Sequence, residues 1–95
     1  MSQIVSTQKP LFPLGKVVAT PGALKAIPAK EICRSLSRHQ TGDWGNLSPA
    51  DQRANNDAVS FGGRFLSAYR FQDTRYWIIT EADRSATTVL LPSEY

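Results

Sequence analysis

The stretch that decides the fold is residues 64–91, RFLSAYRFQDTRYWIITEADRSATTVLL, in which three strand-like runs are separated by short polar turns. Over residues 65–71, apolar and aromatic side chains recur at every second position, which predicts a strand with one buried face. Residues 76–80 and 87–91 are dense in β-branched and aromatic side chains, and Pro92 ends the last run because it has no amide hydrogen to donate. The stretch therefore predicts a three-stranded antiparallel meander.

The residues before the meander predict the helices that cover it. Thr20 and Ser48 are helix-capping residues, and each precedes a proline, which suits the first turn of a helix. Residues 14–19 are a further strand candidate that could extend the meander at one edge. The predicted class is therefore α+β, a three- to four-stranded antiparallel sheet with a C-terminal meander, covered by two or three short helices.

Residues 28–38 predict the most clearly amphipathic helix, with basic residues four positions apart on one side and apolar residues on the other. We expect the apolar side to face the sheet, with Cys33 as a small core residue. The helix that follows Ser48 is expected to pack on the sheet through a narrow face of small residues and to end at Gly62. The two predicted buried faces are, in order, Ala29, Ile32, Cys33 and Leu36, and Ala50, Ala54, Ala58 and Phe61.

A chain of 95 residues gives one domain with one modest core. Hydrophobic residues make up 41% and charged residues 20%, as in ordinary globular proteins and unlike disordered or membrane-spanning chains. We expect a flexible leader over residues 1–13, with Leu11 and Phe12 docking on the body, and a single α+β domain over residues 14–95. A single cysteine and the absence of an apolar secretory signal predict a cytoplasmic protein without disulfides or membrane contact.

The net charge of +3 is unevenly distributed along the chain. Residues 1–40 carry four lysines and two arginines against one glutamate, a balance of +5, and residues 41–95 carry five arginines against seven carboxylates, a balance of −2. The basic groups of the N-terminal part permit a polyanionic partner.

The loop over residues 38–45, RHQTGDWG, is the first candidate for chemistry. His39 and Asp43 could act as a general base and its orienting carboxylate, and the glycines would let the loop turn tightly around a substrate. The structural alternative is that Trp44 fills the core, Asp43 accepts hydrogen bonds from local amides and His39 caps the helix.

The turn over residues 80–85, TEADRS, is the second candidate. Glu81 and Asp83 could be paired acid and base groups or metal ligands, with Arg84 stabilising a transition state. A metal would need a third ligand from Asp43 or His39, and the alternative is a structural turn in which Asp83 caps amides and Arg84 pairs with an acid. The sequence has no P-loop, no Cys/His zinc spacing and no Gly-x-Ser-x-Gly elbow, so we expect neither a cofactor nor a metal.

Basic groups beside aromatic side chains are the third candidate, because single-stranded nucleic acid binders combine the two. The alternative is that the basic stripe of the helix over residues 28–38 is an ordinary solvated face. The candidate partner-binding residues are Lys25, Lys30, Arg34, Arg38, Arg70 and Arg75, with Tyr69, Tyr76 and Trp77 as stacking platforms.

Three blocks of the chain together resemble a known family. They are FPLGKVVATPGAL at 12–24, RHQTGDWG at 38–45, and WIITEADRSATT at 77–88 followed by Leu90-Leu91-Pro92. This combination resembles the small plasmid-related proteins of bacterial mobile elements, some of which carry the label of type I restriction subunits, and the resemblance covers residues 12–95. The resemblance implies a gene carried on plasmids, phages or integrated elements, where small proteins counter host defence or manage nucleic acid.

From these observations we expect a non-enzymatic accessory protein of a mobile element. Its partner would be a host protein or nucleoprotein complex, for example a CRISPR or restriction complex, which it would bind and block. One alternative is a small nuclease or other hydrolase that uses His39 and Asp43 together with Glu81, Asp83 and Arg84. A second is a nucleic-acid-binding regulator of plasmid maintenance.

Overall fold

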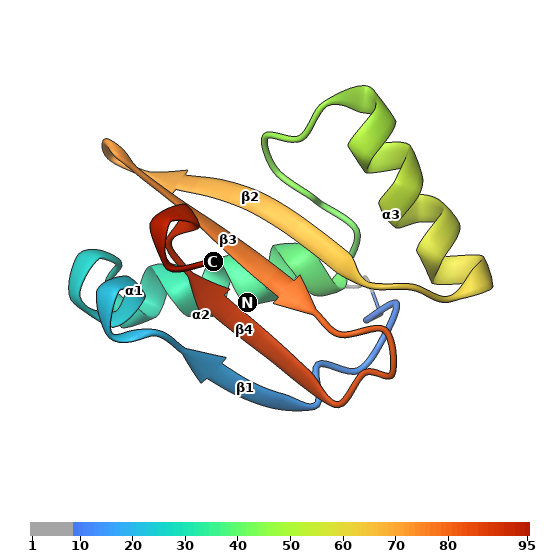
Figure 1. Ribbon diagram of the computed structural model, residues 1–95, viewed down its shortest axis with the longest axis horizontal. Helices are drawn as coiled ribbons and strands as arrows, with labels where there is room; N and C mark the ends of the chain where they lie inside the picture. Colours follow the sequence, from blue (N-terminus) through green and yellow to red (C-terminus); the bar gives the residue numbers. More distant parts are fainter. Residues whose placement is uncertain (1–8) are drawn as a thin grey trace, which may run out of the picture.

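The computed structural model describes residues 9–95, which form a four-stranded sheet with helices packed on one face and beside one edge (Figure 1). The strands run in the order β1-β4-β3-β2, in which β2 pairs with β3 and β3 with β4 antiparallel. This confirms the α+β class and the C-terminal meander. The strands are β1 (Lys16–Ala19), β2 (Phe65–Phe71), β3 (Thr74–Thr80) and β4 (Ala86–Leu90).

Strand β1 extends the meander at one edge as expected, but it pairs with β4 in parallel rather than antiparallel. Three helices separate β1 from β2, so no tight turn forces β1 to run antiparallel to a neighbour. Backbone hydrogen bonds hold the strand at both ends, from Lys16 N to Ser85 O at 3.0 Å and from Thr20 N to Val89 O at 2.9 Å.

The predicted helix starts are confirmed, because the side chains of Thr20 and Ser48 both accept a hydrogen bond from the backbone amide three residues on, at 3.2 Å. Glu94 then ties the C-terminal turn to the first helix, since its carboxylate accepts hydrogen bonds from the Thr20 hydroxyl and the Gly22 amide. The hydrogen bond from the Thr20 hydroxyl lowers the pKa of Glu94, and those from the Leu91 and Gly22 amides add to the effect. The helices are α1 (Pro21–Ala26), α2 (Ala29–Gln40), α3 (Pro49–Phe61) and the 3₁₀ turn η1 (Pro92–Glu94).

Helix α2 lies across one face of the sheet, which we call the helix face (Figure 1). Its buried residues are Ile32, Ser35 and His39, so the helix packs through a partly polar stripe. The prediction that Cys33 is a core residue is wrong, because it lies beside this stripe and is exposed. The prediction considered only apolar residues as buried, so it placed the buried face of α2 to one side of Ser35 and His39.

The predicted buried face of α3 is confirmed at Ala58 and wrong at its other three positions. Ala50 and Ala54 are exposed and Phe61 is 87% exposed, and Asn55, which was not predicted, is buried together with Ala58. The reason is that α3 lies beside one end of β2 and not on a face of the sheet (Figure 1). A helix in this position contacts backbone at the strand edge, where an amide side chain is more useful than an alanine.

Asn55 joins α3 to this edge by two hydrogen bonds. Its Nδ2 donates to the carbonyl oxygen of Leu66 at 2.7 Å, and its Oδ1 accepts from the amide of Leu66 at 3.2 Å. The side chain therefore satisfies the outward-pointing backbone groups of one residue of β2, as a neighbouring strand would.

The loop before α3 satisfies the next outward pair on β2. The Ala68 amide donates to the Trp44 carbonyl at 3.1 Å, and the Asn46 amide donates to the Ala68 carbonyl at 2.7 Å. Gly45, between them, has φ +77°, and a β-carbon there would lie 2.0 Å from the Ala68 carbonyl oxygen. Only glycine allows the loop to approach the strand this closely.

A cluster of stacked aromatic rings fills the space between the loop, β2 and the N-terminal segment. Phe12, Trp44 and Phe65 stack with interplanar angles of 13° to 21°, and all three are buried. The expected docking is therefore confirmed for Phe12, whereas Leu11 is 48% exposed, and the folded body starts before residue 14. Residues 1–8 of the expected flexible leader lie outside the described part of the chain.

Within residues 9–95 there is no helix with the length and apolar character needed to traverse a lipid bilayer.

Replacement of Asn55 by alanine is expected to lower the free energy of unfolding by about 1–3 kcal/mol, because it leaves the amide and carbonyl of Leu66 without partners. Urea unfolding measures this difference. Asp57→Ala, at an exposed position of the same helix, is the control and should change stability by less than about 0.5 kcal/mol. Equal stability of the Asn55 variant and the wild type would contradict the role given to this side chain.

Candidate functional site

The chain's one histidine, His39, projects from α2 towards the sheet, is completely buried and forms hydrogen bonds to two strands. Its Nδ1 lies 2.6 Å from Ser67 Oγ on β2, and its Nε2 lies 2.9 Å from Thr80 Oγ1 on β3. The rings of Phe12 and Trp44 approach the imidazole edge-on, at centroid distances of 5.3 and 5.8 Å. Burial in this apolar surrounding lowers the pKa of His39 to about 4, so the imidazole is neutral at pH 7.

The direction of each hydrogen bond in this chain follows from its far end. The Thr87 hydroxyl donates to the Leu14 carbonyl at 2.7 Å, so its oxygen accepts from the Thr80 hydroxyl at 2.8 Å. Thr80 has then used its only proton, and His39 Nε2 must donate to it. Nδ1 is left as the acceptor for the Ser67 hydroxyl, so the geometry requires the Nε2–H tautomer.

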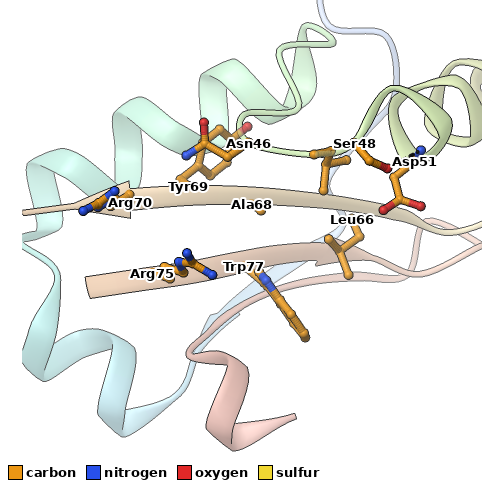
Figure 2. Close-up of a pocket in the computed structure, with 10 residues that line it drawn as sticks. Asn46, Ser48, Asp51, Leu66, Ala68, Tyr69, Arg70, Arg75 and Trp77 are labelled. Atoms are coloured by element: carbon orange, nitrogen blue, oxygen red, sulfur yellow. Dashed lines mark hydrogen bonds between the residues drawn. The ribbon is translucent and has the colours of Figure 1, made fainter. Parts of the chain in front are cut away.

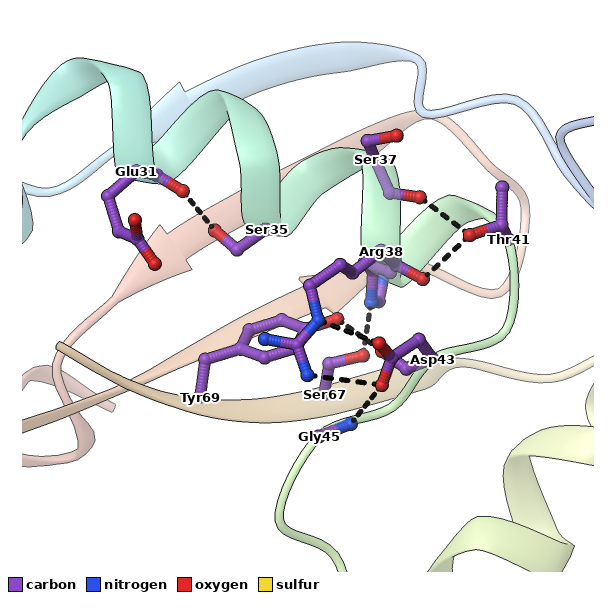
Figure 3. Close-up of polar contacts among 10 residues, drawn as sticks. Glu31, Ser35, Ser37, Arg38, Thr41, Asp43, Gly45, Ser67 and Tyr69 are labelled. Carbon is purple, nitrogen blue, oxygen red and sulfur yellow. Dashed lines mark hydrogen bonds and ion pairs between the residues drawn. The ribbon is translucent and has the colours of Figure 1, made fainter. Parts of the chain in front are cut away.

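Asp43 does not orient this histidine, because its carboxylate points to Arg38 instead (Figure 3). Arg38 Nε and Nη2 donate to the two carboxylate oxygens at 2.7 and 3.2 Å, and the guanidinium carbon lies 4.6 Å from the centre of the Tyr69 ring. The hydrogen bond from Arg38 lowers the pKa of Asp43, and Oδ1 also accepts from the Gly45 amide. The expected base and orienting carboxylate are therefore not brought together, and Asp43 fixes the loop.

The turn after β3 is held by Arg84, which has φ +63° and donates to backbone carbonyls of Glu81, Ala82 and Gly63. Its guanidinium lies 4.4 Å from the centre of the Phe65 ring. Asp83 accepts a hydrogen bond from the Ser85 amide at 3.0 Å. Arg84 and Asp83 thus do what the structural alternative predicts, except that Arg84 binds carbonyls and not an acid.

The Gly42–Gly45 loop and the Glu81–Ser85 turn both contact the Phe12–Phe65 ring stack, but through Trp44 and Arg84. No hydrogen bond among residues 9–95 links a carboxylate of the turn to Asp43 or His39. In the same residues, no three His, Cys, Asp or Glu side chains lie close enough to hold a metal ion. Within residues 9–95 the two segments therefore meet at the ring stack and not through a carboxylate bonded to Asp43 or His39.

The basic candidates on the helix layer are all at least partly exposed, and two of the four pair with a carboxylate. Lys25, at the end of α1, and Lys30 and Arg34, on α2, are exposed, and Arg34 lies 3.8 Å from Glu31. Arg38 belongs to the same stripe by spacing, but its pairing with Asp43 commits it to the loop. Lys25 and Lys30 are therefore the two candidates of this layer that pair with no carboxylate within residues 9–95.

Arg70 and Arg75 lie on the other face of the sheet, directly opposite each other in the β2–β3 register. Tyr69 and Tyr76 have the opposite parity, so they are buried against the helix face and cannot be stacking platforms. Burial raises the pKa of both tyrosines. Trp77 shares the face of the arginines and is only partly buried, so it is the one predicted platform that stays accessible.

We call this second face the open face, because η1 is the one described helix that lies on it (Figure 1). The C-terminal Tyr95 packs edge-on against Trp77 at a centroid distance of 5.7 Å. Arg64 in turn donates to the Tyr95 hydroxyl at 3.1 Å. These contacts support the indole ring from one side.

A hollow of about 560 Å³ lies along the open face and the outer edge of β2, between the β2–β3 hairpin and the start of α3 (Figure 2). In Figure 2, Arg70 and Arg75 are at one end, Ser48 and Asp51 at the other, and Trp77 lies between them. The remaining lining residues are Asn46, Leu47, Leu66, Ala68 and Tyr69.

Sequence reasoning named Arg70, Arg75 and Trp77 but missed Asn46, Ser48, Asp51 and Tyr95. Strand alternation could have separated Trp77 from the two tyrosines, since they differ in parity. Asn46, Ser48 and Asp51 reach the site because Asn55 and the loop around Gly45 attach α3 to β2, and no local pattern signals that. Tyr95 reaches Trp77 from the C-terminal turn η1.

Comparison with protein-family models, with curated proteins and with solved structures gave no match for this chain.

The hydrogen-bond directions predict that His39 carries its proton on Nε2 at pH 7, with Nδ1 unprotonated. Long-range ¹H–¹⁵N correlation spectra report the tautomer directly, and the chain's single histidine makes the assignment unambiguous. A spectrum of the Nδ1–H tautomer would contradict the chain of donors from Ser67 to Leu14.

The low pKa of His39 also predicts a loss of stability in mild acid. The unfolded chain takes up a proton near pH 6.5, whereas the folded protein does so only near pH 4, so the stabilisation is complete above pH 6.5 and is lost as the pH falls towards 4. The free energy of unfolding should be about 2 kcal/mol lower at pH 5 than at pH 7.5. Urea unfolding across this range measures it.

The variant His39→Gln is the control, because it removes the chain's only side chain with an ordinary pKa in this range. Its stability should vary little between pH 7.5 and pH 5. A wild-type protein whose stability is flat over the same interval would show that His39 is not held neutral by burial.

Proposed function

We propose that this protein is a non-enzymatic accessory protein of a bacterial mobile element, which binds a host defence protein or nucleoprotein complex and blocks it. The observation that supports this proposal best is the pair of arginines on the open face. Arg70 and Arg75 are exposed, stand opposite each other and border a hollow beside Trp77. Neither is among the arginines that pair with a carboxylate within residues 9–95.

Unpaired arginines beside an aromatic ring are what recognition surfaces use. Arginine and tryptophan are enriched among the residues that dominate binding energy at interfaces, and guanidinium groups bind carboxylates and phosphates through two hydrogen bonds at once. A partner with an anionic surface fits this face, and a net charge of +3 assists its approach.

The candidate catalytic groups support binding over catalysis, because the fold already uses them. The imidazole of His39 is enclosed and neutral. Asp43 is paired with Arg38, and Arg84 holds its own turn. The resemblance of residues 12–24, 38–45 and 77–92 to small plasmid-related proteins supports the mobile-element setting.

Plasmid establishment tests the proposed function. The protein is expressed in bacterial hosts with and without an active restriction or CRISPR system, and transformants are counted for a plasmid that the system targets. The wild-type protein should raise establishment of the targeted plasmid only in the defended host. Arg70→Glu with Arg75→Glu should remove this effect, because the reversed charges repel an anionic partner.

The matched control is Lys30→Glu with Arg34→Glu, which makes the same change in net charge on the opposite layer of the protein. This variant should protect the plasmid as the wild type does. No protection by the wild type against any tested defence system would overturn the proposed function. Loss of protection in the control alone would place the binding surface on α2 instead of the open face.

A further inference from the structure

The two arginines of the open face are held close together, and neither pairs with a carboxylate within residues 9–95. Leu66 and Ala68 direct their backbone groups away from β3, so by the two-residue period Arg70 and Arg75 form a non-hydrogen-bonded pair, in which side chains are closest. Their β-carbons are thus about 5 Å apart, and like charges opposite each other at this distance are destabilising. An anion bound between the two guanidinium groups would remove this repulsion.

Few groups of the protein occupy these guanidinium donors. Arg70 gives Nε to the Gln72 carbonyl at 3.0 Å, and no hydrogen bond within the described chain involves its terminal nitrogens or the side chain of Arg75. Five N–H groups in a planar fork match the oxygens of a phosphate. The pair is therefore suited to one phosphate group.

Trp77 offers a flat apolar surface next to this anion site. It lies two residues from Arg75 on the same face, about 7 Å along β3. Its cross-strand neighbour on β2 is Ala68, whose small side chain leaves room beside the ring. The ring of Tyr95 packs edge-on against the indole. A planar base attached to the bound phosphate could stack on the indole.

The shape and polarity of the hollow agree with a ligand of this kind. Its volume of about 560 Å³ is within the range of small-molecule sites. Asp51 lies at the end away from the arginines (Figure 2), so the phosphate is favoured at one end and a neutral base at the other. Asn46 lines the hollow from the loop at the outer edge of β2.

We propose that the open face binds single-stranded nucleic acid, with one nucleotide in the hollow, its phosphate on Arg70 and Arg75 and its base on Trp77. A duplex fits less well, because its bases are stacked and their faces are hidden from the ring. Arg64, which donates to the Tyr95 hydroxyl beside Trp77, provides a further cation on this face. The inference rests on the proposed function and names the chemistry of its partner.

Fluorescence anisotropy tests this with the full chain and a fluorescein-labelled single-stranded DNA of mixed sequence and about 12 nucleotides, a length that one small binding domain covers. The strand should bind more tightly than a duplex of the same sequence. Arg70→Gln with Arg75→Gln should weaken binding at least tenfold and reduce the slope of log affinity against log salt by about 0.7, the value for one phosphate contact on a single strand.

Trp77 supplies two further measurements. Trp77→Ala should weaken binding by about 5- to 150-fold, the effect of losing one stacked base, and Trp77→Phe, which keeps an aromatic ring and the packing with Tyr95, should weaken it less. The wild-type protein needs no substitution for the second measurement. Trp44 is 3% exposed, so quenching of tryptophan fluorescence by unlabelled strand reports Trp77.

The control Lys30→Glu with Arg34→Glu should change the affinity less than the arginine variant does. Absence of binding by the wild type, equal losses in the two paired variants, or no quenching of Trp77 would each overturn the nucleic-acid site. Plasmid protection that depends on Arg70 and Arg75 without any strand binding would overturn this inference and leave the proposed function standing. Strand binding without plasmid protection would overturn the proposed function and leave the nucleic-acid site standing.

Discussion

The structure depends on a neutral imidazole held between a helix and a sheet. His39 projects from α2 and hydrogen-bonds Ser67 on β2 and Thr80 on β3, and Thr80 passes the chain on to Thr87 on β4. Thr87 closes it on the Leu14 carbonyl, just before β1. Each donor in this buried chain has one acceptor, so the register of the strands and the position of the helix are specified together.

This use of polar groups inside the fold determines which charged groups remain for a partner. Arg38 and Arg84 stand over aromatic rings and hold loops by hydrogen bonds. Both belong to the two segments that the sequence suggested as catalytic candidates, residues 38–45 and 80–85, and in the structure both hold a loop or turn in place. Arg70 and Arg75 are on the open face, they are exposed, and neither pairs with a carboxylate within residues 9–95.

Much of the fold could be predicted from local patterns, because alternation, capping residues and prolines act over a few residues. The strands of the meander and the starts of α1 and α3 follow from such signals. The buried faces of α2 and α3 do not, because His39 and Asn55 are buried where they hydrogen-bond strands of the sheet, and the buried Ser35 satisfies its hydroxyl on carbonyls of its own helix. Hydrophobic periodicity has no information about partners distant in the chain.

The candidate site was predictable in part for the same reason. Parity along β2 and β3 places Arg70, Arg75 and Trp77 together, and it sends Tyr69 and Tyr76 to the other face. The far wall of the hollow comes from the start of α3, which is placed by tertiary contacts.

The most direct measurement of the central claim is a map of side-chain NMR shifts on addition of the partner. The account predicts changes at the Arg70 and Arg75 guanidinium groups and the Trp77 indole, and changes confined to Lys30 and Arg34 on α2 would contradict it.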